Sequence, residues 1–430
     1  MKPVLQLALD FVNLKRAVKV AEEAVAKGVD WLEAGTPLIK SEGLNSVREL
    51  RGKFPRHKIV ADMKTMDTGR YEVEAAAKAG ADVVILLGVA DDSTIREAVE
   101  AGKNYGCEIM VDLMNVGDMK GRAVKLAKLG VDYLCVHVSI DQQMSGMDPI
   151  RELKKVSNAV NIPVAIAGGI NSETAADAVK AGASIVVVGG AITKAEDAKK
   201  AAQQIKKAIT SGKRIKSELY KKYLEPEKVF GKVSTTNISD AMHRCGDLEG
   251  ILPMAGIQTG KRMVGKAVTV RTYPGDWAKP VEAIDIAKKG DVIVIDCEGV
   301  GKAVWGELAS NSCMRKKIAG VVINGFARDT DDIEEIGFPV FARGKRPAAG
   351  EPKGFGEINV PIRISGIGIR PGDYIVGDSD GVVVIPKEKA IEIANRAMDV
   401  AEKENRIRRE IEKGGTLSSV LELRKWERAR

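Results

Sequence analysis

The sequence predicts an α/β protein that contains a (β/α)₈ TIM barrel over residues 1–210 and an α+β domain over residues 225–395. Two observations predict the barrel. Short apolar runs alternate with amphipathic helical patterns along the first half, and this alternation implies parallel βαβ units. There are eight such units in about 210 residues, the number and size expected of a closed barrel. An open doubly wound sheet is the alternative, but it rarely contains eight units of this regularity.

Each predicted strand is an apolar run bounded by turn residues. The eight runs are Val4–Asp10, Asp30–Gly35, Lys58–Lys64, Asp82–Gly88, Glu108–Met114, Asp132–Val138, Ile162–Gly169 and Ser184–Gly190. Helical patterns such as Ala17–Lys27, Tyr71–Ala79 and Glu173–Ala181 lie between them.

Charged side chains mark the predicted strand ends. Five of the eight ends carry an ionisable group: Asp10, Glu33, Asp62 with Lys64, Asp112 and His137. Catalytic groups of (β/α)₈ enzymes lie at the C-terminal ends of the strands. A single charge there is usually only solvated, but five on one barrel mouth predict an active site.

The densest charge pattern is the segment Asp62–Asp67. Residues two apart on a strand share a face, so Asp62 and Lys64 are expected to point the same way, with Asp67 in the following loop. Charges this close shift one another's pKa values. A salt-bridged surface turn would produce the same pattern.

Two glycine pairs end the last two predicted strands, Gly168-Gly169 and Gly189-Gly190. Glycine lets the backbone approach an anion, and backbone N–H groups attract it. The loops after strands seven and eight commonly bind phosphate in such barrels. The pairs therefore predict a phosphate site, with two plain tight turns as the alternative.

With these residues the first half resembles hexulose-6-phosphate synthase, in the orotidine-5′-phosphate decarboxylase suprafamily. The matching pieces are Leu9-Asp10, Glu33-Ala34-Gly35-Thr36-Pro37, Asp62-x-Lys64-x-x-Asp67, Asp112, His137 and the two glycine pairs. A neighbouring family, 3-keto-L-gulonate-6-phosphate decarboxylase, shares the metal-site carboxylates and the lysine. Its members typically have Glu, Thr and Arg where this chain has Asp112, Ala167 and Ala191, so the smaller residues here favour the synthase.

The resemblance implies reversible aldol condensation of formaldehyde with D-ribulose 5-phosphate through a metal-stabilised enediolate, as in the ribulose monophosphate pathway. Glu33 and Asp62 would bind Mg²⁺ or Mn²⁺, for which oxygen ligands are suited. Lys64 would hold substrate oxygens and His137 would move the C1 proton, because its free pKa lies near neutrality. A histidine satisfied in the core is the alternative. The resemblance assigns substrate binding to Asp10, Asp112, Gly168, Gly169, Gly189 and Gly190, and places Asp67 across a barrel dimer interface, where it would help to fix Lys64.

The second half has short β-rich runs in place of regular alternation. The expected strands are Lys266–Thr272, Asp291–Cys297, Gly320–Asn324, Val340–Ala342, Ile358–Ile364, Tyr374–Asp378 and Gly381–Ile385. Helices are expected at Ser239–Cys245, Pro280–Ala287 and Ala303–Met314.

This half resembles the RraA-like family, which includes ribonuclease-activity regulators and 4-hydroxy-4-methyl-2-oxoglutarate aldolases. The matching blocks are Gly290–Asp296, Trp305–Ala309, Gly325–Asp329, Pro339–Gly344, Arg370–Tyr374 and Asp380–Val383. The resemblance implies a swivelling β/β/α domain that assembles into trimers or hexamers. It leaves two roles open: a 2-oxo-acid aldolase or decarboxylase, or a non-catalytic module with a ribonuclease partner.

The aldolase pattern places an acidic residue twenty-one positions before an Arg-Asp pair, as Glu307 precedes Arg328 and Asp329 here. Arg328 would grip a 2-oxo-acid carboxylate and Asp329 would hold Mg²⁺ through waters. Backbone N–H groups of Gly306, Glu307 and Leu308 would bind an oxyanion. Aldolases often have Asp where Glu307 stands. A salt bridge of Arg328 with either acid is the alternative.

Composition narrows the classes of protein to which the chain can belong. Apolar residues make up 44% of the chain, enough for full cores. There is no apolar run long enough to span a membrane and the N-terminus does not have the form of a signal peptide, so a cytoplasmic protein is expected. Five scattered cysteines without CxxC spacing predict reduced thiols.

Part of the net charge of +8 is concentrated in one segment of the chain. Lys199–Lys222 contains nine Lys or Arg and one acid, so we interpret residues 211–224 as a basic linker, with an RNA-binding arm as the alternative. Residues 396–430 are expected to form a charged helical tail. Leu417, Val420, Leu421 and Trp426 give it an amphipathic end that could dock on a neighbouring subunit.

Overall fold

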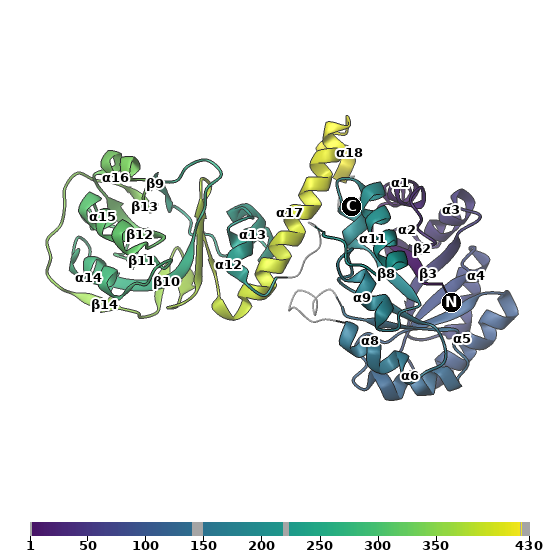
Figure 1. The fold of residues 1–430 in the computed structure, drawn as a ribbon. Helices are drawn as coiled ribbons and strands as arrows, with labels where there is room; N and C mark the ends of the chain where they lie inside the picture. Colours follow the sequence, from purple (N-terminus) through teal and green to yellow (C-terminus); the bar gives the residue numbers. More distant parts are fainter. Residues whose placement is uncertain (1, 140–148, 218–222, 422, 424–430) are drawn as a thin grey trace, which may run out of the picture. The chain divides into compact units, whose positions relative to one another are not determined.

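The computed structural model describes residues 2–139, 149–217, 223–421 and 423 (Figure 1). The chain divides into two compact units. The first combines Met1–Lys222 with Glu402–Arg430, and the second is Tyr223–Ala401.

The first unit contains a closed barrel of eight parallel strands in sequential order, which confirms the predicted fold class. The strands are β1 (Val4–Leu9), β2 (Trp31–Ala34), β3 (Lys58–Thr65), β4 (Val83–Leu87), β5 (Glu108–Asp112), β6 (Tyr133–His137), β7 (Val164–Ala167) and β8 (Ile185–Val188). Strand pairing runs from β1 through β8 and back to β1. Every predicted strand therefore exists, and all strand ends meet at one mouth.

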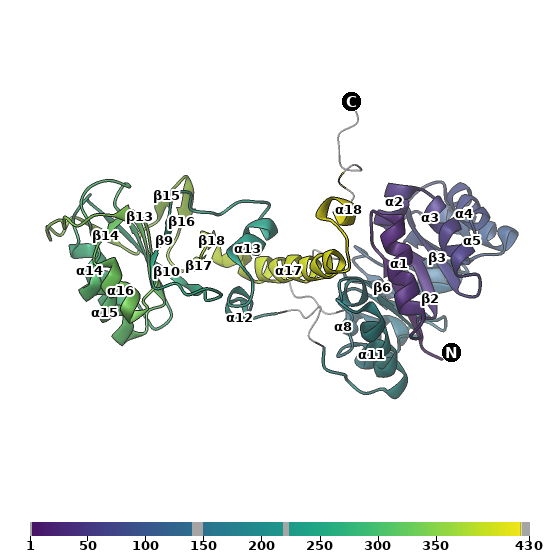
Figure 2. The same ribbon diagram turned by 90° about the horizontal axis from the view of Figure 1, so that it is seen from above.

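Helices surround the barrel (Figure 2). They are α1 (Leu14–Val25), α2 (Thr36–Glu42), α3 (Asn45–Lys53), α4 (Gly69–Lys78), α5 (Asp92–Tyr105), α6 (Met119–Lys128), α8 (Ile150–Ser157), α9 (Ala175–Lys180), α10 (Gly190–Thr193) and α11 (Ala198–Ser211). Side-chain caps begin several of them: Asn13 accepts from the Arg16 N–H and Asp197 from the Lys200 N–H. Such caps satisfy otherwise unpaired N–H groups and contribute about 1 kcal/mol each.

Alternation along β1 shows how the barrel separates its core from its site. Leu5, Leu7 and Leu9 are fully buried in the cluster beneath the helices. The intervening side chains, Gln6 and Ala8, face the cavity inside the barrel. Burial of each leucine contributes roughly 1.5–3 kcal/mol. The outward face thus stabilises the fold, while the inward face is free to carry polar groups.

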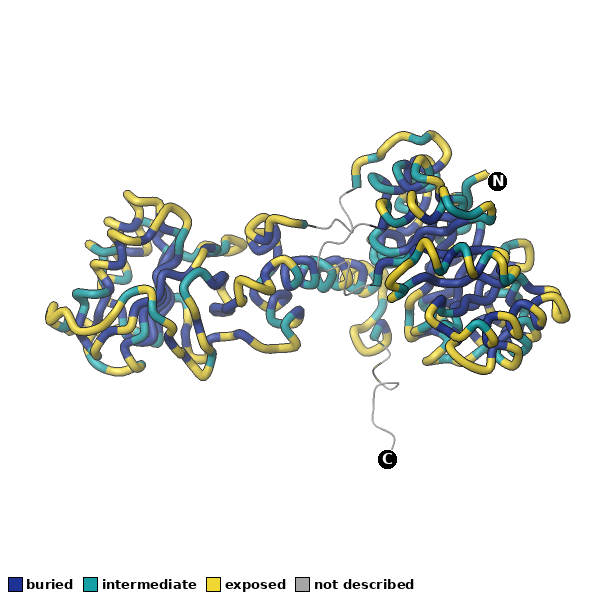
Figure 3. The backbone as a smooth tube through the Cα atoms, turned by 90° about the horizontal axis from the view of Figure 1, so that it is seen from below, coloured by how far each residue is buried: buried dark blue, intermediate teal, exposed yellow. Residues whose placement is uncertain are grey.

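The opposite end of the barrel is filled by aromatic side chains. Trp31 and Tyr133 pack edge to face with ring centroids 5.5 Å apart. The ammonium of Lys58 lies 4.7 Å from the Trp31 ring and pairs with Glu108. Figure 3 shows the barrel strands as buried backbone. With this end filled, the interior opens at the C-terminal ends of the strands.

The second unit is a mixed sheet in the order β18-β17-β10-β11-β12-β13-β9, with a separate β15-β16 hairpin. Its strands are β9 (Leu252–Ala255), β10 (Met263–Thr272), β11 (Val292–Asp296), β12 (Gly320–Ala327), β13 (Val340–Lys345), β14 (Gly356–Ile358), β15 (Ile362–Ile364), β16 (Ile367–Ile369), β17 (Tyr374–Asp378) and β18 (Gly381–Ile385). Strands β10 to β13 are parallel and the flanking pairs are antiparallel. The α+β class is confirmed.

Helices of this unit are α12 (Pro226–Phe230), α13 (Thr235–Ala241), α14 (Ala278–Ile286), α15 (Glu307–Lys316), α16 (Thr330–Ile336) and the 3₁₀ turn η1 (Lys387–Lys389).

Three of the elements expected in the second half were wrong in detail. The run Ile358–Ile364 is split between β14, which pairs with β10, and the hairpin strand β15. Helix α15 begins four residues later than Ala303, because Trp305 bridges to Ala327 and Gly306 is extended. Helix α13 begins at Thr235, where Ser234 forms a capping box with Asn237.

The tail is helical, in α17 (Ala390–Glu412) and α18 (Leu417–Leu421). Residues from Glu402 onward belong to the barrel unit. Val420 is buried, whereas Leu417 and Leu423 are exposed. Trp426, the last residue of the expected amphipathic pattern, lies outside the described residues.

The cysteines are unpaired, and four of them are buried: Cys107, Cys135, Cys297 and Cys313. Burial raises the thiol pKa of Cys107 to about 11 and that of Cys297 to about 12. Such thiols are poor nucleophiles. In the described part of the chain, we find no helix with the length and apolarity that a membrane span needs.

Candidate active site

The barrel mouth contains a cavity of about 460 Å³. The predicted site residues that line it are Asp10, Glu33, Asp62, Lys64, Asp112, His137, Gly168, Gly169, Gly189 and Gly190. They come from seven different strands or from the loops that follow them. The structure thus brings every predicted barrel-site residue except Asp67 to one cavity.

Lys64 occupies a strained position at the end of β3. The pairing of β3 with β4 shifts register between Ala61 and Thr65, and Lys64 has a φ of 48°. Left-handed backbone is unfavourable for a residue with a side chain, and such strain concentrates at functional sites. The irregularity turns the Lys64 ammonium to within 3.0 Å of Asp62 Oδ2. The two side chains meet as expected, but through a bulge rather than through regular alternation.

Asp112 connects the lysine to the histidine. Its Oδ2 accepts a hydrogen bond from Lys64 Nζ at 2.9 Å and lies 2.7 Å from His137 Nδ1. Its Oδ1 accepts from the Met114 N–H at 2.9 Å. Burial would raise the pKa of this carboxyl, but the positive charges and hydrogen bonds of His137 and Lys64 outweigh it and hold the pKa at about 2. Asp112 is therefore an anion across the physiological range.

An ionised Asp112 determines the tautomer of His137. A carboxylate only accepts hydrogen bonds, so Nδ1 carries the proton and donates it to Asp112. The Nε2 atom of a neutral ring is then an acceptor and is free to take a proton. Burial alone would lower the pKa of Lys64. The carboxylates of Asp62 and Asp112 raise it by more than burial lowers it, so the net shift is upward and Lys64 remains charged.

Three further carboxylates, Asp10, Glu33 and Asp62, gather at the mouth. Burial raises the pKa of Glu33 well above its ordinary value, and the charges of Asp62 and Asp10 raise it further. Burial also raises the pKa of Asp10, with a further contribution from Asp62. Asp10 is exposed to the open cavity that it lines, although atoms of the barrel mouth surround its carboxyl. This corner therefore holds more negative charge than its neighbours neutralise.

Glu33 and Asp62 fit a hard divalent cation. The mutual repulsion that raises the Glu33 pKa is the kind of electrostatic cost that a bound cation relieves. Beside them, Gln6 Nε2 donates to Glu33 Oε2 at 2.6 Å, while Gln6 Oε1 is buried without a hydrogen-bond partner in the described chain. No three His, Cys, Asp or Glu side chains of the described residues form a preassembled metal site. Two protein carboxylates with waters are sufficient for Mg²⁺.

Two polar neighbours of the carboxylates were not predicted, Gln6 and Thr36. Thr36 Oγ1 donates to Asp62 Oδ2 at 2.7 Å, and Gln6 donates to Glu33. Gln6 could have been found, because it is the one amide in an otherwise apolar strand. Its inward position, two residues before Ala8 and four before Asp10, follows from the period of a strand.

The glycine pairs form the other side of the cavity. Gly168 and Gly169 have φ values of 98° and 72°, which a residue with a side chain rarely adopts. A Cβ added at Gly189 would lie 3.4 Å from Asp10 Oδ2, on the cavity side. Thr193 and Lys194, at the end of the short helix α10, also line this side. Glycine backbone, one hydroxyl and one ammonium thus line this side of the cavity.

Two sequence-based expectations fall outside this cavity. Asp67 is exposed and accepts a hydrogen bond from the Thr68 N–H at 2.7 Å. Within one chain Lys64 is held by Asp62 and Asp112, so the role of Asp67 across a dimer interface remains a prediction. Ala191 is buried and lines a neighbouring cavity instead. Of the residues used to separate synthase from decarboxylase, Asp112 and Ala167 contact the barrel-mouth cavity.

In the second unit, the predicted residues surround the start of α15. Arg328 Nε lies 3.3 Å from Asp329 Oδ2, and the Glu307 N–H donates to the same oxygen at 3.3 Å. Glu307 itself bonds to Asn311. Of the two salt bridges considered, the structure therefore contains the one with Asp329. A Cβ on Gly306 would lie 2.5 Å from Asp329 Oδ2, so glycine leaves the room that this carboxylate occupies.

Leu308 and the guanidinium of Arg328 are accessible. The Leu308 residue is 78% exposed, and the Arg328 side chain is 42% exposed. Asp329 has a φ of 55°, another strained residue at a predicted site. The Arg-Asp pair thus presents a cation and a carboxylate to solvent beside a backbone N–H.

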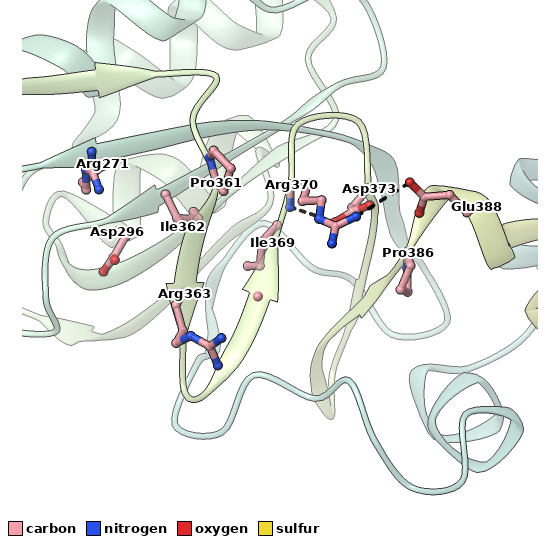
Figure 4. A pocket seen from close by; sticks show the side chains of 11 residues that line it. Arg271, Asp296, Pro361, Ile362, Arg363, Ile369, Arg370, Asp373, Pro386 and Glu388 are labelled. Atoms are coloured by element: carbon pink, nitrogen blue, oxygen red, sulfur yellow. Dashed lines mark hydrogen bonds and ion pairs between the residues drawn. The ribbon is translucent and has the colours of Figure 1, made fainter.

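A cavity of about 620 Å³ in this unit lies beside the β15-β16 hairpin (Figure 4). Its arginines are already engaged: Arg271 pairs with Glu357, Arg363 donates to the Gly366 carbonyl, and Arg370 lies 3.9 Å from Glu388. Asp373 accepts from the N–H groups of Arg370 and Lys387. Internal pairing accounts for these charges, so we assign no ligand to this cavity.

Comparison with known proteins agrees with both halves. Residues 3–205 match the family model of the orotidine 5′-phosphate decarboxylase / HUMPS family. The 3-hexulose-6-phosphate synthase of Bacillus subtilis (strain 168) is 43% identical over 209 residues, which cover 99% of that protein and 48% of this chain. The chain belongs to the orotidine 5′-phosphate decarboxylase / HUMPS family. The 3-hexulose-6-phosphate synthase of Methylomonas aminofaciens is 44% identical over 201 residues, covering 96% of that protein and 46% of this chain.

Among solved structures, the 3-hexulose-6-phosphate synthase of Salmonella typhimurium is 38% identical, with a TM-score of 0.48, covering 49% of this chain and 100% of that one. Residues 235–384 match the Aldolase/RraA family model, so this HUMPS-family barrel is joined to an RraA-like domain. Both predicted resemblances are confirmed.

Proposed function

We propose that the barrel is an aldehyde-lyase that reversibly condenses formaldehyde with D-ribulose 5-phosphate to D-arabino-hex-3-ulose 6-phosphate. The observation that carries this is the connected chain of Lys64, Asp112 and His137 beside the carboxylates Glu33 and Asp62. It places a fixed cation and a proton acceptor at the same cavity. The identity to 3-hexulose-6-phosphate synthases supports it.

The residues of the site have two roles in the proposed reaction, proton transfer and stabilisation of negative charge. His137 Nε2 takes the C1 proton of the pentulose phosphate, and the Lys64 ammonium stabilises the negative oxygen that develops. The resulting carbon nucleophile at C1 attacks the formaldehyde carbon, forming the new C–C bond. The new alkoxide then takes a proton from His137, which returns the ring to its neutral form.

A divalent cation held by Glu33 and Asp62, Mg²⁺ or Mn²⁺, would supply further positive charge at the substrate oxygens. Asp10 is placed to accept hydrogen bonds from substrate hydroxyls. The glycine pairs with Thr193 and Lys194 would bind the phosphate, at the loops after β7 and β8.

The test is formaldehyde-dependent consumption of ribulose 5-phosphate by the full chain with Mg²⁺. Asp62→Ala removes a cation ligand and a partner of Lys64, so we expect kcat/KM to fall at least about 100-fold. Glu100→Ala changes an exposed carboxylate on α5 and serves as the control. Turnover of Asp62→Ala at the wild-type rate would contradict the assignment. Release of CO₂ from 3-keto-L-gulonate 6-phosphate would support the decarboxylase alternative instead.

For the RraA-like domain we propose a weak Mg²⁺-dependent lyase activity on 2-oxo acids. The motivation is the exposed Arg328–Asp329 pair beside the Glu307 N–H. Arg328 would bind the substrate carboxylate through two parallel N–H groups. Oxaloacetate and 4-hydroxy-4-methyl-2-oxoglutarate are the test substrates. A domain that turns over neither one but inhibits a ribonuclease would instead be a binding module.

A further inference from the structure

The tail beyond the RraA-like domain inserts a buried arginine into the barrel unit. Arg406, on α17, is 2% exposed. Its guanidinium bonds to both carboxylate oxygens of Glu23 on α1, at 3.2 and 3.3 Å, and to Glu410 Oε1 at 3.0 Å. A charged group this deeply buried is retained only when its donors are satisfied.

The remaining contacts of Arg406 are with backbone. Its Nη1 donates to the carbonyl of Ala195 at 3.1 Å and to that of Glu196 at 3.4 Å. These residues follow α10 after one intervening residue, Lys194. The Ala195 N–H donates back to the Ile192 carbonyl at 3.2 Å, and the Lys194 N–H to the Gly190 carbonyl at 3.0 Å. Arg406 is thus linked by hydrogen bonds to the turn that begins at Gly189.

The segment that Arg406 holds lies between two cavities. On one side, Gly189, Gly190, Thr193 and Lys194 line the barrel-mouth cavity. On the other side, a cavity of about 390 Å³ lies against Lys194, Ala195, Glu196 and the tail residue Asn405. A segment with a cavity on each side has less packing to fix its position. The bonds to Arg406 supply a fixed point at its C-terminal end.

The same tail contacts α1 through a second ion pair. Arg16 Nη2 lies 3.2 Å from Glu410 Oε1, and the Arg16 guanidinium stacks 5.6 Å from the Phe11 ring, next to Asp10. Charges therefore alternate along Glu23, Arg406, Glu410 and Arg16. The Bacillus subtilis synthase aligns over 99% of its length with the first half of this chain, so it has no counterpart of these tail residues.

We propose that Arg406 is a positioning residue for the phosphate end of the barrel site. By fixing the Ala195 and Glu196 carbonyls it holds the Gly189–Lys194 turn in the form that receives the phosphate of the substrate. This inference rests on the proposed synthase function and adds a part that the single-domain relatives lack. Arg406 is not among the residues that line the barrel-mouth cavity, so its effect should appear in substrate binding.

The test compares full-length variants in the ribulose 5-phosphate assay. Arg406→Lys keeps a positive charge but cannot make the planar set of contacts to two carbonyls and two carboxylates. We expect KM for ribulose 5-phosphate to rise about tenfold, because one set of charge-assisted hydrogen bonds is lost. The kcat of the variant should stay within about twofold of the wild-type value. Arg409→Lys, exposed on the same helix, is the matched control.

A second variant guards against loss of folding. Arg406→Met with Glu23→Gln removes the donors together with the partly buried acid that would otherwise lose its partner. The same rise in KM is expected, provided that the circular dichroism spectrum is unchanged. A KM within twofold of wild type in either folded variant overturns the inference, and so does a fall in kcat at unchanged KM.

A binding measurement separates this inference from the proposed reaction. Inorganic phosphate is titrated calorimetrically into the full-length wild type and into Arg406→Lys. A wild type that binds phosphate more tightly than the variant supports the inference even if no aldol turnover is found. Equal phosphate affinity in the two proteins, or no binding to the wild type, overturns it.

Discussion

Asp112 Oδ2 lies 2.7 Å from Nδ1 of His137. The same oxygen accepts a hydrogen bond from Lys64, so one buried carboxylate determines the orientation of both the lysine and the histidine of the site. This arrangement explains why an acid at the end of β5 matters although it would not itself exchange protons. Its depressed pKa, about 2, keeps it ionised and therefore keeps Nε2 of His137 the basic nitrogen.

The first prediction concerns Asp112→Asn. The amide cannot provide the charge that orients His137 and Lys64, so kcat/KM should fall about 100-fold. Loss of one partner from a buried charged pair should also lower the free energy of unfolding by about 3 kcal/mol. Steady-state kinetics and urea unfolding measure the two effects. Asp285→Asn, exposed in the other unit, should change neither. Wild-type kinetics in Asp112→Asn would refute the proposed proton-transfer arrangement.

The second prediction concerns the pH dependence of stability. The pKa of Glu33 is raised in the folded state by burial, Asp62 and Asp10. The folded protein therefore binds a proton that the unfolded chain releases above its ordinary pKa of 4.5. Its contribution to stability is present below that pKa and is lost as pH rises through the raised folded value. In EDTA, we expect Tm to decline over this window in the wild type more than in Glu33→Gln.

A bound divalent cation should oppose this loss of thermal stability at rising pH. Mg²⁺ competes with the proton for Glu33, so its stabilising effect on Tm should grow as pH rises through the same window. Glu33→Gln should lose most of this effect. A Tm that is equally insensitive to Mg²⁺ in both proteins at every pH would argue against Glu33 as a ligand.

The third prediction concerns Gly189→Val. Gly189 has a φ of −103° and a ψ of −94°, a combination outside the regions that residues with side chains favour, so the change should also strain the turn. The new side chain would begin 3.4 Å from Asp10 Oδ2 and occupy space on the phosphate side of the cavity. We expect KM for ribulose 5-phosphate to rise at least about tenfold. Gly52→Val, which meets no neighbour within 4 Å, is the control. An unchanged KM would place the phosphate elsewhere.

The fourth prediction concerns Arg328→Lys in the RraA-like domain. Lysine cannot make the paired planar contact with a carboxylate, so turnover of oxaloacetate should fall about tenfold or more. The oligomeric state should stay that of the wild type, because the change is conservative in size and charge. Arg315→Lys at the end of α15 is the exposed control. Equal turnover in the two variants would remove Arg328 from the proposed site.

The architecture was largely predictable because it depends on local periodicity. Eight apolar runs separated by amphipathic patterns leave few arrangements other than a barrel, and each run became a strand. The second half was less regular, and its errors have local causes. Ile358–Ile364 contains Pro361, which cannot donate to a sheet ladder, and the chain changes partner around it. The helix expected from Ala303 begins at Glu307, because Trp305 pairs with a distant strand.

Strand order also determined which side chains would share the barrel mouth, since the C-terminal ends of parallel strands converge. Asp10, Glu33, Asp62, Asp112 and His137 could therefore be named from the sequence alone. Tertiary structure decided how they connect: the strained turn at Lys64, the shared oxygen of Asp112, and the contacts of Gln6 and Thr36. It also decided that Arg406, 211 residues beyond Ala195, bonds to the carbonyl that follows the glycine turn. Periodicity is a property of neighbouring residues, whereas a hydrogen bond depends on distances that only the folded chain sets.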